Sequence, residues 1–386
     1  ETATSTSQTV HVDGAFSINN PGTQSGVVDT PISTLTIGFT GGRASYTMSA
    51  SGLPAGLSFN AANGEITGTP TSGGSSTITV DATDANGVAA SSMSFTFTIT
   101  AKPLDTPSAP VVTPVNGSTS KLHLVLTGVS NASSYMLYVV QHETGNSLVP
   151  VSLTTADLAG YDMTGLSANK LYDFTLVAVG DGINYSNSDT STVGSASTYP
   201  TPQTPTYTHS NFTVNATETQ YIEMSVHGTV TDGGTLTYAW YKGTTDLGNS
   251  TETLTIASAD VTDDGSYHVV ITNTLNGNVV TTSTSDFTLN VSALLQITAP
   301  SNYTGLIQDS VGTRQFTTAG GAGTIALTAH TVAGSLPAGV TYDATTATIS
   351  GTPEATGSYE MYVTATDENG FSVDSAHFTL TINKKT

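Results

Sequence analysis

Hydrophobic and polar residues alternate along much of the chain with a period of two. Ile78 and Val80 flank one polar residue, and Phe95, Phe97 and Ile99 repeat the alternation further on. This period is typical of strands that bury one face, whereas no window shows a sustained apolar period of 3.6 residues. Gly, Pro and Asn interrupt the pattern at short intervals. The sequence therefore predicts many short strands joined by turns and almost no helix.

One stretch of the pattern occurs twice. Residues 53–70 read LPAGLSFNAANGEITGTP, and residues 336–353 read LPAGVTYDATTATISGTP. The same offset, without a gap, aligns Phe95, Phe97 and Ile99 with Phe378, Leu380 and Ile382. A match of this length predicts that the first and last parts of the chain share one fold.

A β-hairpin is expected inside this repeat. Residues 57–59 and 65–67 are its strands, and Asn63-Gly64 is a two-residue turn signal between them. In the second copy Thr346-Ala347 stands at the same place, so we expect a different turn there.

The repeated motif resembles the putative-immunoglobulin, cadherin-like family of bacterial surface proteins. The family's hallmark is LPxGLxFxxxxGxIxGTPT, and the likeness covers about residues 8–101 and 297–384. The resemblance implies a β-sandwich at each end of the chain, which we place at residues 1–102 and 293–386.

The segment after the first copy contains Tyr135-Met136-Leu137-Tyr138-Val139 and then Leu171-Tyr172-Asp173-Phe174. With the following run LVAVGDGINYSNS it resembles a bacterial fibronectin type III domain, which we place at residues 103–199. The resemblance implies a tyrosine corner at Tyr172. The family's strand-B Trp is missing, and Leu124 or Leu126 takes its place.

The next segment holds the only Trp of the chain, Trp240, followed downstream by Asp263-Asp264-Gly265-Ser266-Tyr267. This order resembles an I-set immunoglobulin domain, which we place at residues 200–292. The resemblance implies a buried Trp240 and puts Val269 where the family has a disulfide Cys. Its partner position falls near Met224, so an apolar pair is expected in place of the disulfide.

Together these segments predict the fold class: an all-β tandem array of four immunoglobulin-like β-sandwiches, elongated. Spaced prolines punctuate the first two junctions and favour stiff connectors. The third junction holds Leu294 and Leu295 without proline, so the last two sandwiches are expected to pack closely. Strands of about ten residues would give a rod on the order of 150 Å.

Composition narrows the function classes. The net charge is −21 and the chain holds eight basic residues, so a nucleic-acid partner is disfavoured. It has no cysteine, which argues against a disulfide-bonded animal ectodomain. It contains no apolar run of 18 or more residues, so no transmembrane segment is predicted. The polar start at Glu1, without Met, fits either a processed N-terminus or a cloned fragment.

Calcium is the candidate ligand with the clearest residues. Asp81 and Asp84 lie near one turn of the first copy, and Asp367 and Glu368 near the matching turn of the second. Carboxylate oxygens are the ligands that calcium prefers, and the likeness to cadherins points the same way. The alternative is that Asp84 and Asp367 cap the turns that follow them.

No catalytic residue set is predicted, because the eight His residues are scattered and no nucleophile motif is present. Tyr185, Tyr199 and Tyr207 are candidates for an exposed sugar-binding platform near the second linker, although tyrosines also pack at junctions.

We therefore expect an extracellular or cell-surface scaffold: a surface stalk, a surface-layer subunit or a fibre subunit. Its partners would be a protein or glycan at a cell surface, or copies of itself. The alternatives are carbohydrate- or receptor-binding accessory modules of a larger secreted protein, and a phage decoration or tail-fibre protein.

Overall fold

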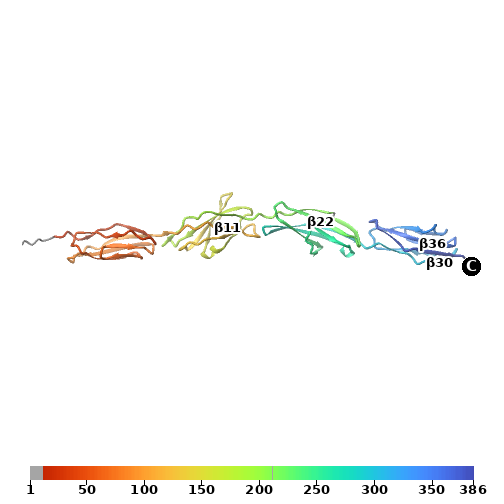
Figure 1. Cartoon of the computed structure of the whole chain (residues 1–386), viewed down its shortest axis with the longest axis horizontal. Coiled ribbons are helices and arrows are strands. Elements are labelled where there is room, and N and C mark those ends of the chain that lie inside the picture. The colour runs from red at the N-terminus through yellow and green to blue at the C-terminus, as the bar shows by residue number, and fades with distance from the viewer. Residues whose placement is uncertain (1–11, 211) are drawn as a thin grey trace, which may run out of the picture. The chain divides into compact units, whose positions relative to one another are not determined.

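The regular secondary structure of the described residues consists of β-strands and two short 3-10 segments (Figure 1). The computed structural model describes residues 12–210 and 212–386, in which the only helical segments are two 3-10 turns. The chain divides into two compact units, Glu1–Thr201 and Pro202–Thr386. Each unit holds two separate hydrophobic cores, and we number the four modules built around them 1 to 4 in chain order. The all-β sandwich class predicted by the two-residue period is confirmed.

Module 1 packs a four-stranded sheet, in the order β2-β9-β8-β5, against a three-stranded sheet in the order β3-β7-β6. Its core side chains alternate with exposed ones along the strands, as the sequence predicts; Ile78 and Val80 are fully buried. The strands are β1 (Ser17–Ile18), β2 (Gln24–Val27), β3 (Leu35–Thr36), β4 (Phe39–Thr40), β5 (Thr47–Ser51), β6 (Leu57–Asn60), β7 (Glu65–Gly68), β8 (Gly74–Thr83) and β9 (Met93–Thr100).

The β6–β7 hairpin forms where it is expected, but its loop differs. Asn60 pairs with Glu65, so four residues form the loop and not the two of an Asn-Gly turn. Gly64 closes it with φ +71° and donates its N–H to the Asn60 carbonyl at 2.9 Å. The prediction of a two-residue turn at Asn63-Gly64 was therefore wrong, because a left-handed Gly can end a longer loop as well as a two-residue one.

Module 4 makes the same loop with a different residue. Its hairpin pairs Asp343 with Thr348, which again leaves four loop residues, and Ala347 stands at the left-handed position with φ +57°. The expectation of a different turn was therefore wrong. The surrounding sheet imposes the conformation even on a residue with a Cβ, whose buried methyl group packs into the core of module 4.

Module 2 pairs β11-β12-β16 in one sheet and β14-β13-β17-β19 in the other, with β15 also pairing β13. Leu122 and Leu124 of β12 are fully buried in its core, in the strand where the fibronectin-type Trp is missing. The elements are β11 (Val111–Pro114), β12 (Leu122–Val125), β13 (Ser134–Gln141), β14 (Asn146–Ser147), β15 (Val151–Leu153), η1 (Thr155–Ala159), β16 (Tyr161–Met163), β17 (Leu171–Val179), β18 (Tyr185–Ser186) and β19 (Gly194–Ser197).

Module 3 pairs β20-β22-β25 in one sheet and β21-β28-β26-β23-β24 in the other, with β27 also pairing β26. Trp240 is fully buried at its centre, as predicted, and its Nε1 donates to the Thr251 carbonyl at 2.9 Å. Met224 and Val269 are fully buried in the same core. The elements are β20 (Thr206–His209), β21 (Thr213–Thr217), β22 (Ile222–Thr229), β23 (Thr235–Lys242), β24 (Thr245–Asp246), β25 (Thr253–Ile256), η2 (Val261–Asp263), β26 (Gly265–Leu275), β27 (Asn278–Ser283) and β28 (Phe287–Ser292).

Module 4 repeats the arrangement of module 1. One sheet has the order β30-β38-β36-β33, with β37 also pairing β36, and the other has the order β31-β35-β34. The strands are β29 (Gln296–Thr298), β30 (Tyr303–Leu306), β31 (Arg314–Gln315), β32 (Thr317–Ala319), β33 (Ala326–Thr331), β34 (Val340–Asp343), β35 (Thr348–Gly351), β36 (Gly357–Thr366), β37 (Ser372–Asp374) and β38 (Phe378–Asn383). The shared topology is what the repeat predicts.

A short parallel pair joins modules 1 and 2 within the first unit. β10 (Lys102–Pro103) runs beside β18 of module 2. Asn184 Oδ1 accepts the N–H of Gly73 at 3.0 Å, and Tyr185 Oη donates to Asp29 Oδ2 at 2.5 Å. The Asp181 carboxylate organises the loop of residues 181–185, because its Oδ1 accepts the backbone N–H groups of residues 183, 184 and 185. These bonds hold the pKa of Asp181 below its ordinary value.

The linker between modules 3 and 4 is bonded to both of them within the second unit. Leu295 is 3% exposed, and the backbone N–H of Leu294 donates to Glu218 Oε2 at 2.8 Å. On the other side, Gly321 donates its N–H to the Ala293 carbonyl at 2.8 Å. These bonds tie the linker residues 293–294 to module 3 and to module 4, and close packing of the two modules stays a prediction.

Candidate functional site

The first candidate for calcium, Asp84, lies in the turn after β8 and is 7% exposed. Its Oδ2 accepts the N–H of Arg43 at 3.0 Å, and its Oδ1 accepts those of Asn86 and Val88 at 2.9 and 2.8 Å. These hydrogen bonds, that of Arg43 first, hold the pKa of Asp84 below its ordinary value. Both carboxylate oxygens thus face N–H groups, which carry partial positive charge and disfavour a cation.

Asp367 has the same role in module 4. Its Oδ2 accepts the N–H of Ala322 at 3.1 Å, and its Oδ1 accepts that of Phe371 at 2.9 Å. Gly370 closes the turn by donating to the Asp367 carbonyl at 3.0 Å. The geometry of both turns is the capping arrangement that the sequence left as the alternative.

The other two candidates lie apart from these carboxylates' hydrogen-bond networks. Asp81 points outward from β8 and accepts a hydrogen bond from the Ser92 hydroxyl. Glu368 is exposed beside a polar hollow that Asn369, Asn215 and Asn290 also line. Within residues 12–210 and 212–386, no group of three or more His, Cys, Asp or Glu side chains is arranged to hold a metal ion.

Calcium binding by Asp81, Asp84, Asp367 and Glu368 stays a prediction, which a calorimetric titration of the whole chain checks. Saturable heat that is lost in Asp81→Asn or Glu368→Gln would support it. A flat titration and an unchanged melting temperature in millimolar calcium would reject it.

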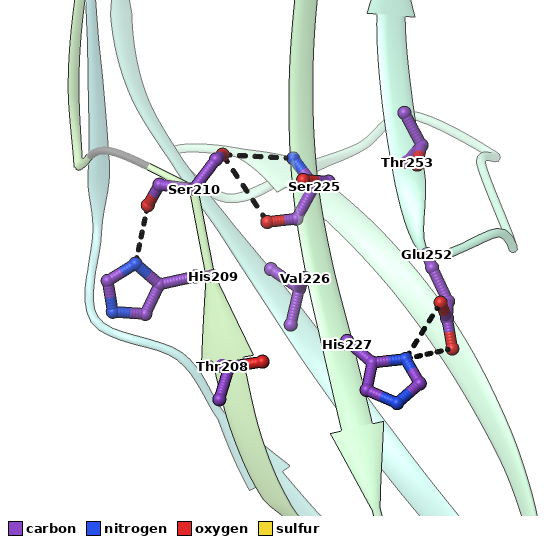
Figure 2. A pocket seen from close by; sticks show the side chains of 8 residues that line it. All are labelled: Thr208, His209, Ser210, Ser225, Val226, His227, Glu252 and Thr253. Atoms are coloured by element: carbon purple, nitrogen blue, oxygen red, sulfur yellow. Dashed lines mark hydrogen bonds and ion pairs between the residues drawn. The ribbon is translucent and has the colours of Figure 1, made fainter.

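A different group of side chains gathers on the outer face of module 3. A depression of about 420 Å³ lies across the end of β20, the middle of β22 and the start of β25. Figure 2 shows the side chains that line it. Its lining is polar except for one residue and consists of Thr208, His209, Ser210, Ser225, Val226, His227, Glu252 and Thr253. We call this depression the module 3 cleft.

Strand alternation places these groups outside the core. Met224 and Val226 of β22 are buried. Ser225 and His227 alternate with them along the strand and therefore face outward. Register then brings partners beside them: Thr208 pairs with His227, and Ser225 with Thr253.

A hydrogen-bonded row forms one side of the cleft. His227 Nδ1 lies 3.1 Å from Glu252 Oε2, and Tyr238 Oη donates to Glu252 Oε1 at 2.7 Å (Figure 2 shows the His227–Glu252 pair). The bonds from His227 and Tyr238 hold the pKa of Glu252 below its ordinary value. Burial, with the bond to Glu252, raises the pKa of Tyr238. Glu252 is thus a carboxylate held in one orientation at neutral pH.

The opposite side of the cleft is held by hydroxyl groups and an imidazole. Ser210 Oγ accepts the N–H of Ser225 at 3.2 Å, and His209 Nδ1 lies 2.5 Å from the Ser210 carbonyl. The His209 ring packs on Phe212 with centroids 3.6 Å apart, and Phe212 packs against buried Phe287. The aromatic cluster fixes the imidazole at the edge of the cleft.

The cleft can form hydrogen bonds to a polar ligand, but its geometry is not that of a hydrolytic triad. In the described part of the chain, no hydrogen bond joins Nε2 of His227 to a hydroxyl group, so the His227–Glu252 pair has no nucleophile beside it.

The sequence did not predict this cleft. His227 and Glu252 are 25 residues apart; His227 lies on β22 and Glu252 directly before the neighbouring strand β25, so only the sheet register brings them together. The same holds for three further His–carboxylate pairs, His123–Asp162, His142–Asp173 and His377–Glu360. Four His residues are therefore paired with a carboxylate that is distant in the sequence. The alternation of apolar and polar residues does not predict such pairs, because it does not give the register of neighbouring strands.

The tyrosines expected to form a sugar platform are half-buried. Tyr185 lies at the first junction, where it bonds Asp29, and not at the second. Tyr207 packs against the core of module 3 and accepts the N–H of Ser285 at 3.3 Å. The side chains of Tyr185 and Tyr207 therefore make contacts within the fold and are not free to form an exposed platform.

Comparison with known proteins agrees with the modular fold. The family model of the putative Ig domain matches residues 2–100 and 292–383. A serine-rich adhesin for platelets from Staphylococcus aureus is 33% identical over 134 residues, which is 35% of this chain and 5% of the adhesin. The homologous adhesin of strain MRSA252 is 32% identical over 134 residues and is covered to 8%. The chain thus spans a small part of the length of these relatives.

Several solved structures resemble the chain in fold. They include Sidekick-1 immunoglobulin domains 1–4, at 12% identity and TM-score 0.36, covering 95% of this chain and 99% of that chain. Protocadherin gamma B2 extracellular cadherin domains 3–6 match at 12% identity and TM-score 0.35, covering 96% of this chain and 100% of that chain. The three N-terminal domains of the bacteriophage RB49 outer capsid protein Hoc match at 11% identity and TM-score 0.33, covering 72% of this chain and 99% of that chain. At such TM-scores these likenesses carry no argument about function.

The fold, the repeat and the staphylococcal relative define the class: a prokaryotic surface protein built of tandem immunoglobulin-like modules. The model of the putative Ig domain matches its first and last modules. In the described residues, no helix is long and apolar enough to cross a lipid bilayer.

Proposed function

We propose that this chain is a structural and adhesive part of a cell surface, as a stalk, a surface-layer subunit or a fibre subunit. One observation carries the proposal: each module has its own closed hydrophobic core, so the array can space or display contacts without a catalytic centre. The resemblance to an adhesin over part of the chain supports it. The net charge of −21 opposes non-specific association.

The module boundaries belong to this proposal. We place them after residues 102, 199 and 292. The core of module 2 begins with Leu104, and that of module 3 ends with Val291, which supports the first and third boundaries.

The test is adhesion and assembly of the whole chain. Microspheres coated with it should adhere in a saturable way to cells or to matrix-coated surfaces, or the free chain should form ordered polymers visible by electron microscopy. A monomer that neither adheres at any coating density nor assembles would contradict the proposal.

The module 3 cleft supports a second candidate function, binding of a hydroxyl-rich ligand such as a glycan. Its hydroxyl, imidazole and carboxylate groups match the donors and acceptors of a sugar. A glycan array probed with the whole chain checks this, followed by the Glu252→Gln variant.

Glu360→Gln is the matched control for the cleft, because Glu360 forms a similar exposed pair with His377 in module 4. Glycan signals lost with Glu252→Gln and kept with Glu360→Gln would place binding in the cleft. An array without hits, or hits unaffected by Glu252→Gln, would exclude the cleft as their receptor.

A further inference from the structure

One sheet of module 2, in the order β14-β13-β17-β19, has an apolar outer face. The core takes every second side chain of β13 and β17, and the side chains between them point outward. Val193, directly before β19, faces the same way by alternation with the residues of that strand. We call the six apolar residues of this surface the module 2 face: Met136, Tyr138, Val140, Val177, Val179 and Val193.

Register places these side chains next to one another. Met136 pairs with Val177 across β13 and β17, and Tyr138 pairs with Thr175 in the next outward row. Val193 continues that second row on the other side of β17. Tyr138 is 40% exposed and Val193 is 55% exposed. The module 2 face is therefore one continuous apolar surface that is open to solvent.

The sheet of module 1 that contains its longest strands has a different outer face. There β8 and β9 place Thr77 opposite Thr96, and Ser75 opposite Thr98. All four are polar hydroxyl residues, so a sandwich of this kind can be built without apolar side chains on that surface. Folding alone does not explain the module 2 face, and exposed apolar patches are typical of contact surfaces.

A fixed anion closes one end of the module 2 face. Asp173 is opposite Val140 in the register, so its carboxylate stands directly beside the apolar side chains. Its Oδ1 accepts a hydrogen bond from Ser195 Oγ at 2.5 Å, and its Oδ2 lies 2.6 Å from His142 Nδ1. The two bonds hold the carboxylate in one orientation at the rim of the face.

Charge decides which kind of partner the face suits. The strands of this sheet hold no Lys or Arg and one acidic residue, Asp173. Residues 103–199 contain seven Asp and Glu residues and two Lys residues, a net charge of −5. Two copies meeting face to face would bring these like charges together, which opposes self-association. A partner with basic groups around an apolar centre would instead be complementary to the face.

We propose that the module 2 face is a contact surface for a protein segment that exposes apolar and basic side chains. The inference rests on the proposed adhesive function and names the kind of partner that adhesion would use. The residue types agree with this role, because Tyr and Met are enriched at the centres of protein interfaces, where Lys and Glu are depleted.

Fluorescence anisotropy of a labelled amphipathic peptide of leucine and lysine, titrated with the whole chain at physiological salt, tests the proposal. Binding should be saturable. The double variant Met136→Thr with Val177→Thr should weaken it by about tenfold or more, because it removes the central apolar row while keeping residues that favour strands.

Val111→Thr with Val125→Thr is the matched control. These residues are register partners on the other sheet of module 2 and are 62% and 44% exposed. The control variant should bind the peptide as the wild type does. If the first double variant loses the hydrogen-exchange protection of β17, the single change Tyr138→Thr at an exposed position replaces it in the comparison.

The proposal is wrong if the wild-type chain does not bind the peptide, or if both double variants weaken binding equally. It is also wrong if a leucine–glutamate peptide of the same pattern binds as tightly. Dimerisation of the chain that is lost with Met136→Thr and Val177→Thr would assign the face to a second copy. Such loss of binding to phosphatidylcholine vesicles would assign it to a lipid surface.

Failure of this inference is distinguishable from failure of the proposed function. A chain that adheres to cells equally well with and without the Met136→Thr and Val177→Thr changes would reject the module 2 face and leave the adhesive function in place. A chain that binds the leucine–lysine peptide through the face, but neither adheres to cells nor assembles, would support the inference and contradict the proposed function.

Discussion

At the scale of single residues, two buried tyrosines return their hydroxyl groups to the backbone just upstream. Tyr172 Oη accepts the N–H of Ser167 at 2.9 Å, which fits the tyrosine corner expected from the sequence. Tyr267 Oη donates to the Asp263 carbonyl at 2.6 Å in module 3. Each bond ties a loop to the strand that follows it, and each hydroxyl is enclosed by the core.

The first prediction concerns Tyr267→Phe. It leaves the Asp263 carbonyl without its donor and should lower the free energy of unfolding of module 3 by about 1–2 kcal/mol. Fluorescence of Trp240, the only Trp of the chain and a residue of module 3, reports this directly in a urea titration. Tyr172→Phe in module 2 is the control and should leave the Trp240 transition in place; an unchanged midpoint with Tyr267→Phe would contradict the account.

The same side chain predicts a pH effect. Burial, with the nearby charge of Asp263, raises the pKa of Tyr267 to about 12. Because the folded pKa exceeds the unfolded value of about 10, the contribution to stability is complete below pH 10 and is lost as the pH rises toward 12. Tyr267→Phe should remove the part of the alkaline destabilisation that arises from this group. An identical alkaline loss in both proteins would contradict the assignment.

His142 gives a second test at this scale. Its Nδ1 lies 2.6 Å from Asp173 Oδ2, and this hydrogen bond raises the pKa of His142 above its ordinary value. A raised His pKa stabilises the fold at low pH, and that contribution fades as the pH rises through the folded pKa. Asp173→Asn should therefore lower the pKa of His142 in an NMR titration.

Glu143→Gln is the matched change for His142, because Glu143 raises its pKa less than Asp173 does. The shift should be smaller than with Asp173→Asn. A His142 that titrates identically in the wild type and in Asp173→Asn would show that the pair does not form in solution.

At the scale of elements, the hairpins show what a local pattern can and cannot specify. Pro54 and Gly56 predict a turn, and the structure has it, with Leu57 donating to the Pro54 carbonyl at 3.1 Å. In module 4 a different loop was expected at Thr346-Ala347, and this expectation was wrong, because Ala347 adopts the left-handed conformation that Gly64 has in module 1. Strand pairing on both sides of the loop overrides the preference of one residue.

Gly64→Ala tests this element. A Cβ there would come within 3.2 Å of the Ile37 carbonyl and 3.3 Å of the Met48 sulfur, and φ is +71°. We expect a cost of about 1–2 kcal/mol in module 1, seen as faster hydrogen exchange over residues 57–68. Ala347→Gly, which relieves backbone strain but removes a buried methyl group, should change module 4 much less; equal protection of wild type and Gly64→Ala would contradict the prediction.

At the scale of the whole molecule, the alternation of residues and the repeat were sufficient to predict the fold class and the matching first and last modules. They could not predict the module 3 cleft, because it depends on which strands lie side by side. His227 and Glu252 meet only through the register of β22 with β25. The β30–β38 pair likewise joins strands at opposite ends of module 4's sequence. Long-range register is fixed by core packing, which a single sequence does not display.

The central claim is that each module folds around its own core, so that the chain works as a modular array. Hydrogen exchange of the whole chain carrying Trp240→Ala tests it most directly, because removing a fully buried Trp costs about 3–5 kcal/mol. Protection should fall in module 3, with any further loss confined to the contact with module 4, while the unit Glu1–Thr201 keeps its wild-type protection. Loss of protection throughout that first unit would contradict the account.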